Sequence, residues 1–198
     1  MITKQFIVAH CYTPSSPLAT AVAILRKECK KISPTAKVPK AGDHTTILPT
    51  FRAPMDEMRQ FSMALSIAEK LCGERNSYRN KARTAGFDFF RNPGNDALII
   101  RIEISQEYRA LVEDCRRQLS DFSDWVFPLH DNTFNPHACV IEEQDLFWKL
   151  NPHMPRLQRQ IPIVGFYLPF PKVLIKIKEG KTTHWEEFDP KKKYKRSF

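Results

Sequence analysis

Glycine is scarce in this chain, with six residues in 198. A phosphate-binding loop needs several glycines at fixed spacing, because only their backbone approaches a phosphate closely. No such loop is present, which argues against a nucleoside-triphosphate motor or a Rossmann enzyme. The Gly-x-Ser-x-Gly elbow of serine hydrolases is missing as well.

Paired cysteines are also lacking. The five cysteines are odd in number and none forms a Cys-x-x-Cys pair, so neither a disulfide framework nor a zinc site of the usual spacing is indicated. Cys29, Cys72 and Cys115 fall at apolar positions of helical patterns, where a thiol behaves as a small hydrophobe. This usage is typical of a reducing compartment, and we expect neither a metal nor a cofactor.

Long apolar runs are absent too. No stretch approaches the roughly 18 apolar residues of a membrane span, and residues 1–5 lack the apolar core of a signal peptide. We therefore expect a soluble, cytoplasmic protein without membrane contact. An apolar content of 42% argues against disorder and supports a sizeable core. The oligomeric state stays open, with a monomer favoured.

Positive charge is plentiful but unevenly placed. The formal net charge is +9, and residues 191–196 alone carry five of the Lys and Arg side chains. The rest of the chain is therefore only mildly basic, which weakens a general nucleic-acid reading. We predict one two-lobed domain over residues 1–190 and a basic tail over 191–198, either solvated or in contact with phosphate.

Hydrophobic periodicity predicts a mixture of strands and helices. Strands are expected over 5–12, 44–48, 81–90, 97–104, 134–141, 161–168, 173–178 and 184–188, and helices after caps at Ser16, Asp56 and Ser105. Turns are expected at 92–96 and at Gly180, and Pro49 should limit the pairing of the second strand. Because no regular strand–helix–strand rhythm appears, we predict an α+β fold with antiparallel sheets.

Two similar triplets stand 93 residues apart in this chain. His44 is followed at the second position by Thr46, and His137 is followed by Cys139. In a strand, residues two apart point to the same face, so each histidine shares a face with a short hydroxyl or thiol side chain. The intervening residues should face the core.

This pattern suits acid/base chemistry on a phosphodiester. Imidazole titrates near neutrality, so one histidine can be neutral while the other is protonated. The neutral ring takes a proton from the attacking oxygen, and the protonated ring gives one to the leaving oxygen. Thr46 and Cys139 would then hydrogen-bond the non-bridging oxygens of the phosphate.

The motifs resemble those of a known superfamily. The runs Asp43-His44-Thr45-Thr46-Ile47-Leu48-Pro49 and Phe134-Asn135-Pro136-His137-Ala138-Cys139-Val140 resemble the paired His-x-Thr/Ser motifs of the two-histidine phosphoesterases. That superfamily includes the RNA 2′,3′-cyclic phosphodiesterases long called 2′-5′ RNA ligases. The order of elements over residues 5–189 is similar as well.

The resemblance implies a bilobal fold with pseudo-twofold symmetry, in which two antiparallel sheets line a central groove and helices lie outside. It implies metal-free cleavage of 2′,3′-cyclic phosphates or 2′-5′ linkages in RNA ends or small nucleotides. His44 and His137 would be the catalytic pair, and Thr46 and Cys139 the phosphate ligands.

Cys139 departs from the family pattern, which has Thr or Ser at that position. A thiol is a weaker donor than a hydroxyl, and its sulfur is larger. Two alternatives therefore stay open: an RNA- or nucleotide-binding module with weakened turnover, and a phosphodiesterase of cyclic oligonucleotide signals.

Several further side chains are candidates for substrate contact. Tyr12, Phe51 and Phe134 are candidates for base stacking, although aromatics beside motif strands more often belong to the core. The cations considered for the groove are Lys81, Arg83 and Arg91. His10 is expected in the core or at a sheet edge, and His130, His153 and His184 in or near loops.

Overall fold

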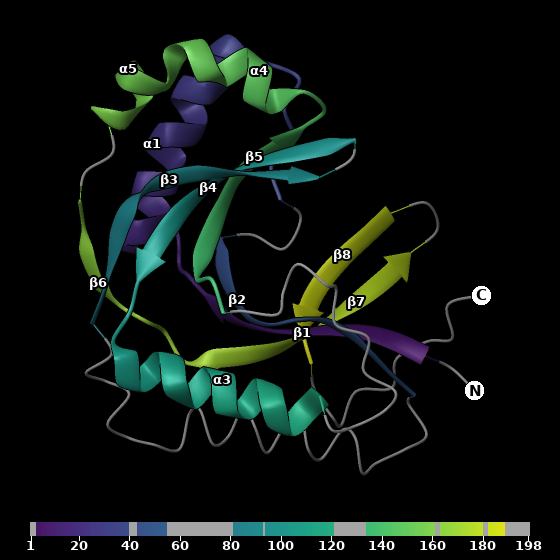
Figure 1. The fold of residues 1–198 in the computed structure, drawn as a ribbon. Helices are drawn as coiled ribbons and strands as arrows, with labels where there is room; N and C mark the ends of the chain where they lie inside the picture. The colour runs from purple at the N-terminus through teal and green to yellow at the C-terminus, as the bar shows by residue number, and fades with distance from the viewer. Residues whose placement is uncertain are drawn as a thin grey trace.

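The computed structural model of the protein describes residues 3–39, 43–54, 81–92, 94–120, 134–160, 163–179 and 182–188. Within these residues the chain forms two antiparallel sheets of four strands each, with helices outside them (Figure 1). The predicted α+β class is confirmed.

Sheet A contains both ends of the described chain, in the strand order β2-β1-β7-β8. Its strands are β1 Thr3–Cys11, β2 His44–Pro54, β7 Pro171–Glu179 and β8 Thr182–Glu187. These strands confirm four of the predictions, but β2 continues past Pro49. The pairing of β2 with β1 shifts register between Phe6 and Val8. This irregularity accommodates Pro49, which has no N–H to donate to the neighbouring strand.

Sheet B is built from the middle of the chain, in the order β5-β4-β3-β6. Its strands are β3 Lys81–Asn92, β4 Asn95–Glu103, β5 His137–Glu143 and β6 Gly165–Tyr167. The turn predicted at 92–96 joins β3 to β4 and contains Gly94 at a φ of 82°, a value that favours glycine. β6 is much shorter than the predicted strand 161–168.

The two longer helices begin at the predicted caps. α1 Pro17–Ile32 follows Ser16, whose Oγ accepts a hydrogen bond from the Ala19 N–H at 3.2 Å. α3 Gln106–Ser120 follows Ser105, whose Oγ accepts from the Tyr108 N–H at 3.2 Å. Proline at the first position of α1 adds to the start signal, because the missing N–H is not needed there.

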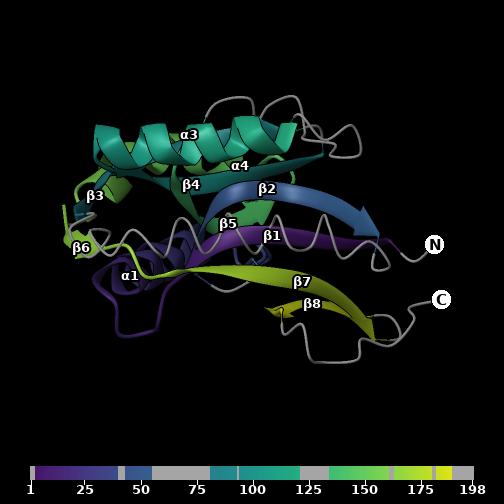
Figure 2. The same cartoon turned by 90° about the horizontal axis from the view of Figure 1, so that it is seen from below.

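Each of these helices packs against the sheet that it does not follow. α1 comes after β1 of sheet A but covers sheet B, whereas α3 comes after β4 of sheet B and contacts β1 (Figures 1 and 2). The series β1-α1-β2 and β4-α3-β5 therefore correspond, and each ends in an edge strand. This correspondence is the pseudo-twofold relation that the family resemblance implied.

The main core lies between sheet B and α1. Leu18, Val22, Leu25 and Cys29 supply the helix side of this core, and each is essentially fully buried. Complete burial of one such aliphatic side chain contributes roughly 1.5–3 kcal/mol. The sheet side is supplied mainly by Leu98, Ile100, Ile102, Ala138, Val140 and Ile141.

A short helical segment between β5 and β6 was not predicted. It comprises α4 Leu146–Leu150, the 3₁₀ turn Asn151–His153 and α5 Met154–Gln158. Its pieces are three to five residues long and two of them begin with proline nearby, so no helical period can be read from them. Leu146, Leu150 and Leu157 nevertheless join the core.

Some predictions fall outside the described residues. These are the helix after Asp56, the turn at Gly180 and the basic tail over 191–198. Among the described helices, none has the length and apolar character needed to cross a membrane.

Candidate functional site

The two triplets lie on corresponding strands of the two sheets. β2 begins with His44 and is an edge strand of sheet A, and β5 begins with His137 and is an edge strand of sheet B. The two edge strands contact each other (Figures 1 and 2). Folding therefore brings the two motifs to one part of the molecule.

The burial pattern confirms the predicted faces in both strands. On β2, Thr45 and Ile47 are each 1% exposed, whereas His44 and Thr46 are half-buried. On β5, Ala138 and Val140 are buried, whereas His137 and Cys139 are half-buried. Because strand residues alternate between faces, each histidine shares a partly accessible face with its hydroxyl or thiol neighbour. We call these two surfaces the motif faces of sheet A and sheet B.

The His137 imidazole has a defined orientation. Its Nδ1 lies 2.7 Å from the carbonyl oxygen of Asn135, and a carbonyl only accepts, so Nδ1 carries the proton and donates. Nε2 is then the atom that accepts a proton in the neutral ring and donates one in the protonated ring. The Phe90 ring meets the imidazole edge to face, with centroids 4.6 Å apart.

His44 stands opposite Cys11 of β1, at the end of the β1–β2 pairing. The residue before it, Asp43, is held in two ways. Its carbonyl accepts a hydrogen bond from the Tyr12 N–H at 2.9 Å, and its carboxylate accepts one from Arg26 of α1 at 2.9 Å. The start of the first motif is therefore fixed both by the sheet and by the helix.

Cys139 has a carboxylate as its neighbour. Its Sγ lies 3.6 Å from Oε1 of Glu142, which is on the same strand, and the thiol donates to that oxygen. Burial, and secondarily the charge of Glu142, raise the pKa of the Cys139 thiol far above its usual range. The thiol is therefore neutral at physiological pH, and its proton is directed at Glu142.

The aromatic candidates lie mostly in the core. Phe134 is only 3% exposed, a burial typical of a core aromatic, and its stacking on a base stays a prediction. Tyr12 packs against the core and its ring meets Phe166 edge to face, while its hydroxyl lies 3.1 Å from Oγ1 of buried Thr45. These contacts place it behind β2, away from the face of His44. The side chain of Phe51 lies outside the described part of the structure.

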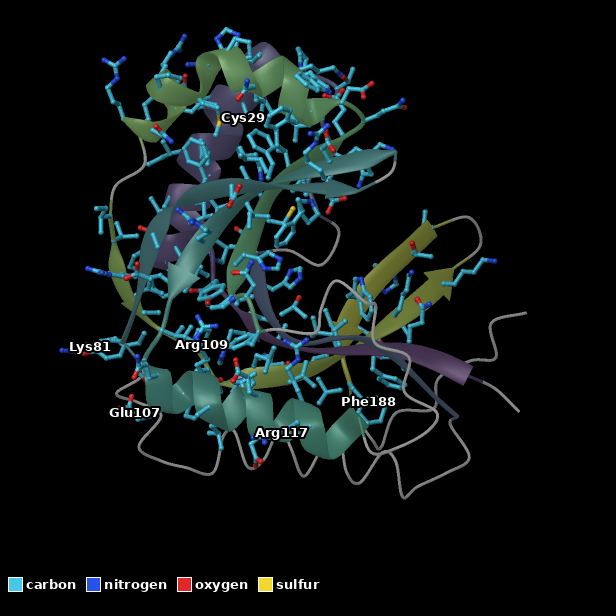
Figure 3. The ribbon with its side chains drawn as sticks, in the orientation of Figure 1. Cys29, Lys81, Glu107, Arg109, Arg117 and Phe188 are labelled. Atoms are coloured by element: carbon cyan, nitrogen blue, oxygen red, sulfur yellow. The ribbon has the colours of Figure 1, made fainter. Side chains whose placement is uncertain are left out.

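The cations named from the sequence are already engaged or peripheral. Arg83 pairs with Glu103 at 2.5 Å, and Arg91 lies over the rings of Phe147 and Trp148. Lys81 is exposed at the start of β3 (Figure 3).

Sequence reasoning missed Arg101 as a candidate. It stands directly opposite His137 across the β4–β5 pairing, so the two side chains share the motif face of sheet B. Its guanidinium lies over the β3 irregularity at Gly86, where a side chain on that residue would come 3.7 Å from Nη2. The strand predicted over 97–104 contains Arg101, but the sequence did not indicate which strand would pair with it.

His10 is a buried structural residue, as expected. Its Nδ1 donates to the carbonyl of Pro169, and its Nε2 accepts from the hydroxyl of Tyr108 at 2.7 Å. Burial lowers the pKa of His10 to about 4, so the ring is neutral at physiological pH. Arg109 lies next to Tyr108 on α3 (Figure 3). It donates a hydrogen bond to the carbonyl of Phe134 and so connects α3 to the segment before β5.

No group of three or more His, Cys, Asp or Glu side chains that could hold a metal ion occurs among the described residues. The other described histidines, His153 and His184, lie in the 3₁₀ turn and on β8. His130 is outside the described residues.

Comparison with known proteins gives a match in fold only. No protein-family model and no curated protein sequence matches the chain. Among solved structures, TT0787 of Thermus thermophilus superimposes with a TM-score of 0.56 and 17% identity, over 93% of this chain and 95% of that one.

Two further structures are less similar. Usb1 of Kluyveromyces marxianus with uridine monophosphate has a TM-score of 0.46 and 10% identity, over 94% of this chain and 98% of that one. The protein ATU0111 of Agrobacterium tumefaciens has values of 0.48 and 12%, over 95% and 85%. At 17% identity, the similarity to TT0787 over most of both chains shows that the two proteins share a fold.

Proposed function

We propose that this chain is a phosphodiesterase in which His44 and His137 act as a paired acid and base on one phosphate. The observation that supports the proposal is the contact between the two edge strands, each of which presents its histidine on a partly accessible face. The substrates would be 2′,3′-cyclic phosphates or 2′-5′ linkages at RNA ends or in small nucleotides.

The reaction needs only proton transfer and attack by water. One neutral imidazole removes a proton from water while the water oxygen forms a bond to phosphorus. The bond from phosphorus to the leaving ribose oxygen breaks, and the other imidazole, protonated, gives its proton to that oxygen. Two imidazoles suffice for these transfers without a metal, and each contributes roughly 10²–10⁴-fold. Which histidine takes which role depends on the direction in which the substrate binds.

The hydrogen bond from His137 to Asn135 is useful in either role. It occupies Nδ1 and thereby directs Nε2 to the substrate, as base when the ring is neutral and as acid when it is protonated. Thr46 would donate its hydroxyl to a non-bridging oxygen on the side of sheet A. Cys139 would do so less well on the side of sheet B, because its proton is directed at Glu142.

The test is a set of single substitutions assayed on cyclic phosphates, 2′-5′ oligoadenylate and cyclic oligonucleotides, with a chelator present. We expect His44→Ala and His137→Ala each to lower kcat/KM by roughly 10²–10⁴-fold. His153→Ala, which changes an exposed histidine in the 3₁₀ turn, is the matched control and should behave as the parent. Full activity in either motif variant would refute the proposal.

The Cys139–Glu142 contact favours a second candidate function, a nucleotide-binding module with little turnover. Glu142 holds the thiol proton, so Cys139 would be a poor donor to the charge that builds on a phosphate oxygen during turnover. Cys139→Thr separates the two candidates. A weakened enzyme should gain roughly threefold to tenfold in kcat, whereas a binding module should keep its salt-dependent RNA affinity and still form no product.

A further inference from the structure

Arg26 connects the two motif strands from behind. It lies on α1, which comes between β1 and β2 in the chain but packs on sheet B. Its Nε donates to the carbonyl oxygen of Val140 at 2.9 Å. β5 is an edge strand of sheet B, and the described residues pair with its outer side only at Glu142, through a bridge to Lys37, so Arg26 supplies the donor for the Val140 carbonyl.

The other end of the same guanidinium reaches the first motif. Nη2 donates to Oδ1 of Asp43 at 2.9 Å, and the side chains of both residues are only 19% exposed. One planar group thus makes one bond to the strand that carries His137 and one to the residue before His44. Guanidinium is rigid, so its two bonds fix the separation of their acceptors.

Neither bond belongs to the core or to the motif faces. Val140 lies next to Cys139 and turns its side chain into the core under α1. Asp43 is the last residue before β2. Arg26 therefore bonds to the backbone of the strand that carries His137 and to the carboxylate of the residue before His44. It approaches both from the helix side of sheet B.

We propose that Arg26 is a positioning residue that sets the separation of His44 and His137 by holding Asp43 and Val140 on one guanidinium. The inference rests on the proposed function, because the geometry it maintains is that of the acid/base pair. A displacement of about 1 Å at such a pair is enough to lower turnover by roughly 10²-fold. Substrate binding depends less on that separation.

Three variants test the inference, with Arg156→Met as matched control. Arg26→Met keeps the length of the side chain and loses both bonds. Arg26→Lys keeps the charge but not the fork, and Asp43→Asn removes the ion pair alone. Arg156 also pairs with a carboxylate, that of Glu28 at 3.0 Å, but its own side chain is 59% exposed and it joins α5 to α1 without touching a motif strand.

The expected result is a split between the kinetic constants. Arg26→Met should lower kcat roughly 10- to 100-fold with KM within about threefold, and Arg26→Lys and Asp43→Asn should fall in between. Free guanidinium ion at millimolar concentration should restore part of the activity of Arg26→Met, whereas sodium chloride of equal ionic strength should not. Arg156→Met should match the parent in every assay.

Ring C–H resonances of the two histidines give a readout independent of turnover. Arg26→Met should shift the resonances of both His44 and His137, and Arg156→Met should shift neither. If Arg26→Met and Arg156→Met have equal kcat, or if neither ring responds, the inference is overturned while inactive His44→Ala and His137→Ala variants would still support the proposed function. Should Arg26→Met fail to fold, Arg26→Lys and Asp43→Asn decide by the same readouts. If both histidine variants stay active, the proposed function fails and the ring resonances alone decide the role of Arg26.

Discussion

Opposite His44, at the edge of sheet A, stands Cys11; opposite His137, at the edge of sheet B, stands Arg101. The two edges have the same register and the same alternation of buried and half-buried residues. Their chemistry differs, because one partner is a small thiol and the other a long cation. The backbone repeat therefore does not imply two equivalent halves of a site.

The next position shows the same divergence toward the core. His10 pairs with Thr45 in sheet A, and Ile100 pairs with Ala138 in sheet B. All four side chains are buried, but the first pair is polar and the second is apolar. Sheet A thus places a polar pair behind its motif strand, whereas sheet B has an apolar pair there and a cation opposite its histidine.

The largest effect that would test this difference is expected from Arg101→Gln. If sheet B supplies the positive charge for phosphate, losing it should raise KM and the inhibition constant of inorganic phosphate roughly 10- to 100-fold. Arg101→Lys should recover part of the affinity. Cys11→Ser, at the equivalent position of sheet A, is the matched control and should change neither constant by more than about twofold.

Equal inhibition constants in Arg101→Gln and Cys11→Ser would remove the asymmetry as a functional feature. Arg101 has reason to be the responsive position, since it stands opposite His137, whereas two lysines of β7 on the motif face of sheet A already have partners. Lys172 pairs with Glu187, and Lys176 donates to Gln5 at 3.0 Å. No hydrogen bond or ion pair of the Arg101 guanidinium is found within the described part of the chain.

The sequence predicted what depends on neighbours along the chain. The caps at Ser16 and Ser105 and the faces of both triplets are local features, and the structure confirms them. What it could not predict is which strands become neighbours. Arg101 and His137 are 36 positions apart, and only the register of β4 against β5 places them together.

Two further features also depend on contacts between distant parts of the chain: whether an aromatic side chain is buried, and whether a short helix forms. Phe134 was a stacking candidate because of its place beside a motif, but it is buried and Arg109 of α3 lies over its ring. The segment 146–158 has too few residues in each piece for periodicity to show. Tertiary packing decides both cases, and a pattern along the sequence does not contain that information.

A smaller effect is expected from His10, on the buried face of sheet A: it should make the free energy of unfolding depend on pH. The pKa of His10 is lowered by burial to about 4, against 6.5 for an ordinary histidine, so the unfolded chain binds the proton more tightly. The stabilisation by the neutral ring is therefore fully present above about pH 6.5 and is lost as the pH falls toward 4. Between about pH 7.5 and about pH 5 the loss should be about 2 kcal/mol.

Urea denaturation at the two pH values measures this loss. His10→Gln should be less stable near neutrality but should show a weaker acid dependence, because it has no proton to bind. Subtracting the two profiles removes the contribution of carboxylates common to both proteins. If the free energy of unfolding of His10→Gln depends on pH as steeply as that of the parent, His10 is not the group responsible. The difference between polar His10 in sheet A and apolar Ile100 in sheet B would then have no effect on the pH dependence of stability.

The smallest effect is expected at Tyr12, which supports β2 from behind. Tyr12→Phe removes the hydrogen bond to Thr45 and keeps the ring contact with Phe166, so unfolding should become about 1 kcal/mol easier. Thr45→Val should cost a similar amount, and the double variant should cost little more than either, since both remove the same bond. Activity should stay within about twofold, because Thr45 faces away from His44 and Thr46.

Tyr12→Leu provides the sharper control, because it deletes the ring. A tenfold higher KM for nucleotides at unchanged kcat would show that Tyr12 contacts the substrate. An unchanged KM with reduced stability would show that sheet A uses this aromatic to hold its motif strand in place.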